Sequence, residues 1–97
     1  MKRKEHVYFH PGVILSEEFM KPLGLSANAL AMAIRVPSNR ISNIVRGRAG
    51  ITADTAIRLG LFFGNEPEFW ANLQRNYELS QARLTHDYSR IEEHVAA

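Results

Sequence analysis

The stretch that decides the fold is SANALAMAIRVPSNRISNIVRGR, residues 26–48. Its apolar residues recur every three to four positions in two short segments, which predicts two amphipathic helices. Ser26 suits the N-cap of the first segment, and Val36-Pro37 separates it from the second. Pro37 suits the first turn of a helix, because its missing N–H costs little there, and Gly47 suits the C-terminal cap. The stretch therefore predicts two helices joined by a tight turn.

The second of these helices has a polar, basic outer face. Ile41 and Ile44 are spaced to point inward, and the side chains left outside include no acid and no large apolar group. In the major groove, Asn pairs bidentately with adenine and Arg with guanine. The N-terminal end of a recognition helix normally supplies the base contacts. The predicted base readers are therefore Ser38, Asn39, Arg40 and Asn43.

A second set of residues is predicted to contact DNA phosphates. Arg46 and Arg48 lie at the far end of the second helix and beyond it, and the N–H groups that open a helix are good phosphate donors. Arg35 stands at a turn position that such motifs often give to Gly. Because Arg tolerates a positive φ less well than Gly, we expect a slightly different turn here. The predicted phosphate contacts are Ala27, Asn28, Arg35, Ser42, Arg46 and Arg48.

Length and composition restrict the class of protein. The 97 residues fit one domain with a modest core, which oligomerisation would supplement. Residues 1–50 carry eight Lys/Arg and three Glu, a charge of +5, whereas residues 51–97 carry four Arg and seven Asp/Glu, a charge of −3. This asymmetry suggests different partners for the two halves. The chain lacks Cys, an apolar signal region and an apolar run of about 20 residues, so we expect a cytoplasmic protein with no membrane contact.

Three further helices are predicted outside this stretch. The first runs from His10 to about Lys21, the second follows the N-cap Thr52 and ends at Gly64, and the third is capped by Asn65. The expected inward face of the second is Ala56, Ile57, Leu59, Gly60 and Phe63. The third carries a stripe, expected to be mostly core, of Phe69, Trp70, Leu73, Tyr77 and Leu84.

The expected domain organisation has three parts. Residues 1–9 form an N-terminal arm, whose apolar part is expected to pack on the body, and residues 10–80 form the helix-turn-helix domain. Residues 81–97 form a C-terminal extension with weak periodicity, for which helix, strand and frayed chain all remain open.

Several motifs together resemble one known family. They include HPG at 10–12, PLGLS at 22–26, GITADTAIRL at 50–59 and PEFWANLQRNYEL at 67–79. In order and spacing the chain resembles the HigA-type (VapI-like) antitoxins, a branch of the Xre helix-turn-helix family, over about residues 10–79. Two positions depart from the family's usual residues: Val13 replaces a frequent Glu, and Arg35 a frequent Gly.

The resemblance implies an all-α, compact five-helix domain of the lambda-repressor type that forms a homodimer. Such proteins bind a palindromic operator in double-stranded DNA, repress their own operon and in many cases neutralise a small RelE-like ribonuclease toxin. By position it assigns base reading to the four residues named above. It implies a packing role for Phe69 and Trp70, and makes Val7, Phe9 and Glu17 weak candidates for toxin contact.

Other function classes compete with this interpretation. His6 and His10 are four residues apart, but Val-Tyr-Phe and a following Pro do not favour the helix that a metal pair would need. Without an HExxH, a Walker loop or a nucleophile motif, we expect no enzyme, metal site or cofactor. A regulator without a toxin, and a protein-interaction module whose basic face is merely solvated, both remain open.

Overall fold

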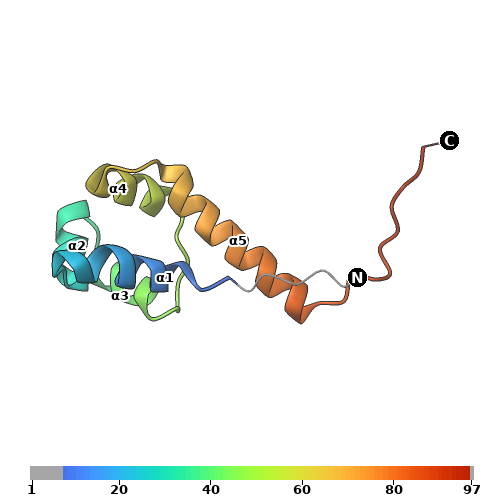
Figure 1. Cartoon of the computed structure of the whole chain (residues 1–97), viewed down its shortest axis with the longest axis horizontal. Coiled ribbons are helices and arrows are strands. Elements are labelled where there is room, and N and C mark those ends of the chain that lie inside the picture. Colours follow the sequence, from blue (N-terminus) through green and yellow to red (C-terminus); the bar gives the residue numbers. More distant parts are fainter. Residues whose placement is uncertain (1–7, 97) are drawn as a thin grey trace.

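The computed structural model describes residues 8–96, and all regular structure in this range is helical (Figure 1). One continuous helical segment comprises α1 (Pro11–Ile14), the π-helical η1 (Leu15–Met20) and the 3₁₀ turn η2 (Lys21–Leu23). It is followed by α2 (Ala27–Ile34), α3 (Ser38–Val45), α4 (Ala53–Phe63) and α5 (Pro67–Thr85). The prediction of an all-α, five-helix fold is confirmed.

The first helical segment begins at a side-chain cap. The Gly12 N–H donates to His10 Nδ1 at 2.9 Å, and Pro11 occupies the first turn, where it needs no N–H partner. The first helix was predicted to end at about Lys21. Pro22 instead lies inside η2, and the segment ends at Gly24 with a left-handed φ of 64°.

The α2–α3 unit follows the predicted pattern, with two corrections. Ser26 Oγ accepts from the Ala29 N–H at 3.0 Å, which confirms the N-cap. Pro37 is the N-cap of α3 and not its first residue, because its ψ of 144° is extended. Arg35 adopts φ 61° and ψ 50°, the left-handed conformation that Gly favours. The expectation of a differently built turn was therefore wrong, because Arg adopts this backbone conformation itself.

The core lies where the first helical segment, α2, α3 and α4 meet the beginning of α5. Its largest buried side chain is Trp70, and Phe19 lies against it with ring centroids 4.7 Å apart. Burying one such large apolar side chain contributes about 1.5–3 kcal/mol. The other fully buried large apolar residues are Leu15, Leu30, Ile41, Ile44 and Leu59. The predicted inward direction of Ile41 and Ile44 is confirmed.

The junction between α4 and α5 differs from the prediction at two residues. Thr52 caps α4 as predicted, because its Oγ1 accepts from the Thr55 N–H, but Ile57 is half exposed, on the side opposite the buried residues. Glu66, not Asn65, is the N-cap of α5. Asn65 Oδ1 accepts from Trp70 Nε1 at 2.8 Å, so this side chain satisfies the buried indole and not the helix end.

Helix α5 projects away from the other helices and the tail after it extends further, so the chain is elongated, 55 × 28 × 22 Å (Figure 1). The predicted stripe is core only in part: Trp70 is buried, Leu73 and Tyr77 are half-buried, and Phe69 and Leu84 are 38% and 55% exposed. The helix continues past residue 80 to Thr85. Residues 86–96 contain one turn, at 89–90, and neither helix nor strand.

Candidate nucleic-acid interface

The outer face of α3 is a polar strip. Asn39, Asn43 and Arg46 recur every three to four residues, opposite the buried Ile41 and Ile44. Ser38 is exposed at the start of the helix, and Ser42 Oγ donates to the Asn39 carbonyl at 3.3 Å. The structure thus brings together three of the four predicted base readers on one short helix: Ser38 and Asn39 are exposed, and Asn43 is half-buried.

Arg40, the fourth predicted base reader, lies on the flank of α3 that faces α4. Its Nη1 donates to Asp54 Oδ2 at 2.8 Å. Asp54 belongs to the first turn of α4, where the same carboxylate oxygen also accepts from Arg58 Nε at 2.9 Å. The hydrogen bonds from Arg58 and Arg40 hold the pKa of Asp54 below its usual value, so this carboxylate is ionised at neutral pH.

Sequence reasoning missed the contacts that Asp54 and Arg58 make beside α3. The spacing of four between them was a visible signal for a pair on one helix face. The contact with Arg40 joins residues 14 apart on two helices, and no local pattern predicts it.

The predicted phosphate contacts have different degrees of access. Arg35, Arg46 and Arg48 are exposed, as is Asn28, whose Nδ2 lies 3.8 Å from Met32 Sδ. The side chain of Ala27 is half-buried and packs against the core. Its predicted contact is therefore restricted to the backbone N–H at the start of α2.

The loop after α3 is held from two directions. Gln74 of α5 accepts the Ile51 N–H at 2.8 Å, and Gly50 leaves room for this side chain, since a Cβ there would lie 2.7 Å from Gln74 Nε2. His10 hydrogen-bonds the Ala49 backbone, and its ring packs edge-on to Tyr77. These contacts fix the chain that carries Arg48.

Comparison with known proteins identifies the family. A helix-turn-helix family model matches residues 17–70, more than half of the chain. Virulence-associated protein I of Dichelobacter nodosus is 51% identical over 80 residues, which cover 82% of this chain and 74% of the relative. Antitoxin HigA-1 of Vibrio cholerae is 42% identical over 72 residues, which cover 74% of this chain and 68% of the relative. The chain belongs to the HigA-type helix-turn-helix antitoxin family.

A solved structure of another antitoxin extends the likeness to nearly the whole chain. Antitoxin GraA, in complex with its operator, superposes with a TM-score of 0.89 and 39% sequence identity. The match covers 99% of this chain and 100% of GraA. It therefore includes α3, the Arg40–Asp54 contact region and the long α5.

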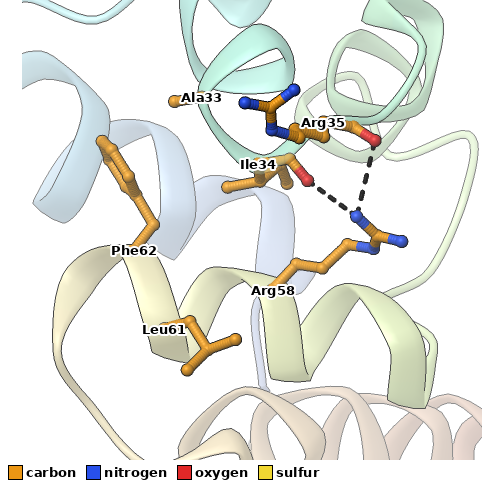
Figure 2. Close-up of a pocket in the computed structure, with 6 residues that line it drawn as sticks. All are labelled: Ala33, Ile34, Arg35, Arg58, Leu61 and Phe62. Atoms are coloured by element: carbon orange, nitrogen blue, oxygen red, sulfur yellow. Dashed lines mark hydrogen bonds between the residues drawn. The ribbon is translucent and has the colours of Figure 1, made fainter.

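Outside the α3 face, this HigA-type chain has a cavity of about 320 Å³ between α2 and α4 (Figure 2). Its lining combines apolar groups with two guanidinium groups; the residues are Ala33, Ile34, Arg35, Arg58, Leu61 and Phe62. Within residues 8–96, none of the helices is both long and apolar enough to cross a membrane.

The three weak candidates for toxin contact have different environments. Val7 lies outside the described residues. Phe9 is 71% exposed, so the expectation that this part of the arm packs on the body was wrong for Phe9. Glu17 pairs with Lys21 at 2.6 Å on the exposed side of the first helical segment. Nothing in these contacts favours one of them over the others.

Proposed function

We propose that this chain is a cytoplasmic, DNA-binding antitoxin that represses its own operon and neutralises a small RelE-like ribonuclease toxin by direct binding. It acts by binding and not by catalysis. The observation that carries the DNA-binding part is the polar, acid-free outer face of α3, with Asn39, Asn43 and Arg46 on one strip. The same fold over the whole chain of GraA, which was solved with its operator, supports this interpretation.

In this proposal two copies bind a palindromic operator. Each places α3 in a major groove, and the two-fold axis sets the two recognition helices about 34 Å apart, one turn of DNA. Ser38, Asn39, Arg40 and Asn43 read base edges. Exposed cations at 35, 46 and 48, with N–H groups at the start of α2, hold the phosphates and fix the register.

Autorepression is tested with a reporter driven by the DNA upstream of the chain's own gene. We expect the wild type to lower reporter output, and a variant with Asn39→Ala and Asn43→Ala to restore it at equal protein level. Tyr88→Ala, on the tail beyond α5, serves as a matched control that leaves the α3 face intact. Equal reporter output with and without the wild type would refute the repressor role.

The toxin role is tested separately. Each short gene next to the chain's own gene is expressed with and without the antitoxin in growing cells. We expect one of them to arrest growth alone, with cleavage of cellular RNA, and to copurify with the antitoxin when growth is rescued. If the chain represses the reporter but none of these genes arrests growth, the chain is a regulator without a toxin. Rescue without repression would instead indicate a protein-interaction module.

A further inference from the structure

A chain of hydrogen bonds links the end of α2 to the recognition helix. Arg58 Nη1 donates to the Ile34 carbonyl at 2.9 Å, and its Nε donates to Asp54 Oδ2 at 2.9 Å. Asp54 Oδ2 in turn accepts from Arg40 Nη1 at 2.8 Å. Figure 2 shows the first part of this chain, with Arg58 reaching from α4 toward the carbonyl groups of Ile34 and Arg35.

This chain fixes the position of the Asp54 carboxylate. Arg58 donates to the backbone carbonyl groups at the end of α2, so its side chain is less free to change conformation than that of an ordinary exposed Arg. Because Asp54 is bonded to this anchored group through a charge-assisted contact, its oxygen is a fixed point beside α3. Arg40 is tied to that fixed point by one end of its guanidinium group.

The contact leaves part of the Arg40 guanidinium group available for a base. A guanidinium group carries five N–H donors in a rigid planar arrangement. Asp54 engages Nη1, which leaves the edge formed by Nε and Nη2 for a bidentate contact such as that with guanine O6 and N7. Ordering a long side chain before binding lowers the conformational cost of the contact.

Asp54 also acts on the DNA backbone directly. Its side chain is 56% exposed, and residues 26–48, which include its partner Arg40, contain no acid. A fixed negative charge there opposes phosphates that approach the flank of α3. It thereby weakens binding to any duplex in which Arg40 gains no base contact in return.

We propose that Asp54 is a positioning residue that sets DNA sequence discrimination, because it orients Arg40 for one base pair and repels phosphates from unmatched DNA. This inference rests on the proposed DNA-binding function. It assigns the recognition of one base pair to a contact between α3 and α4, and makes Arg58 the residue that holds Asp54 in place.

The test compares wild type with Asp54→Asn on defined DNA. Wild-type protein first selects a duplex from a randomised pool. Affinities are then measured for that duplex, for each single base-pair variant of it and for a scrambled duplex, at one salt concentration. Glu68→Gln is the matched control, because it removes one acid from the first turn of α5 and not from the flank of α3. Thermal unfolding establishes that each variant is folded at the assay temperature.

We expect Asp54→Asn to lower discrimination about tenfold at the base pair where Arg40→Gln also lowers it. Binding to the scrambled duplex should become several-fold tighter, which a merely destabilised protein would not show. In the Arg40→Gln background, Asp54→Asn should have no further effect on discrimination. Asp54→Glu, which keeps the charge but moves the carboxylate, should lose discrimination without gaining affinity for the scrambled duplex.

Three results would overturn the inference. Asp54→Asn could behave like Glu68→Gln, it could weaken binding to all duplexes equally, or its effect on discrimination could persist without Arg40. In each case the wild type still prefers the selected duplex, so the proposed function stands. A wild type that selects no duplex and binds all DNA alike would overturn both proposals together.

Discussion

Gly12 lies against the backbone carbonyl of Ile44: a Cβ atom at residue 12 would be 1.9 Å from that oxygen. Residue 12 lies in the first turn of the first helical segment, and Ile44 lies in α3, so the missing side chain lets the first segment contact α3 through its backbone. The His10 cap, one residue before Pro11, holds Gly12 in this place. The HPG motif thus has a physical role in positioning α3.

Gly12→Ala should destabilise the chain, because a backbone oxygen cannot move aside as a flexible side chain can. We expect a loss of about 2–3 kcal/mol in the free energy of unfolding, measured by chemical denaturation. Gly24→Ala is the matched control: no atom lies within 4 Å of its Cβ position, and only its φ of 64° is unfavourable, at a cost of about 1 kcal/mol. A smaller loss for Gly12→Ala than for Gly24→Ala would contradict this account.

Local pattern predicted more of this fold than of the site's contacts. The Ser26 and Thr52 caps and the burial of Ile41 and Ile44 depend on neighbours within a few residues, and all were predicted correctly. The Arg40–Asp54 contact depends on where the fold places α4 relative to α3. Its partners are far apart in sequence, so periodicity carries no information about it.

The errors have the same physical origin. Asn is a residue type that often caps helices, but the side-chain oxygen of Asn65 accepts from the indole N–H of Trp70 once α5 packs against α4. Ile57 is apolar, but the side of α4 that faces the core is set by its neighbours, not by its own hydropathy. The residue type limits which contacts a side chain can make, and tertiary packing determines which of them it makes.

Arg35→Gly should stabilise the chain. Arg35 is the only non-Gly residue with a positive φ in the described part of the chain, and the left-handed conformation costs an L-residue about 1–2 kcal/mol. After the greater chain entropy of Gly is subtracted, we expect a net gain of about 0.5–1 kcal/mol in unfolding free energy. Arg46→Gly, at a residue with an ordinary helical φ of −81°, is the comparison and should destabilise. The same sign for both variants would show that the turn is not strained.

Asn39→Ala and Arg48→Ala should separate base reading from phosphate binding. Asn39→Ala is expected to lose about 1–3 kcal/mol of binding free energy and to relax the base preference at one base pair of the operator. Arg48→Ala should weaken binding to all DNA sequences alike. It should also make the slope of log affinity against log salt concentration shallower by about one. Affinity and base preference are measured on a panel of single base-pair variants. If Asn39→Ala leaves both unchanged, the assignment of readers on α3 is wrong.

Stability should fall as the pH is lowered below about 6.5, because of His10. Burial lowers the pKa of the His10 imidazole from its ordinary value of 6.5, although the hydrogen bond with the Ala49 backbone opposes this. As the pH falls through 6.5, the unfolded chain takes up the proton first, so unfolding is favoured. This stability is fully present above 6.5 and is lost toward the lower pKa of the folded state.

The check is chemical denaturation between about pH 8 and pH 5.5. His10→Asn is the matched variant, because Asn is a good N-cap but has no proton to bind in this range. We expect a flatter dependence of unfolding free energy on pH for the variant. Parallel curves for variant and wild type would assign the dependence to other groups.

The most direct test of the central claim is a binding titration of the wild-type protein across a salt series. The two probes are a duplex from the region upstream of its own gene and a scrambled duplex of the same composition. The account predicts tight binding to the upstream duplex, much weaker binding to the scrambled one, and an affinity that falls steeply with salt as counterions are released. Equal and weak binding to both duplexes would contradict it and would leave the α3 face as a solvated scaffold.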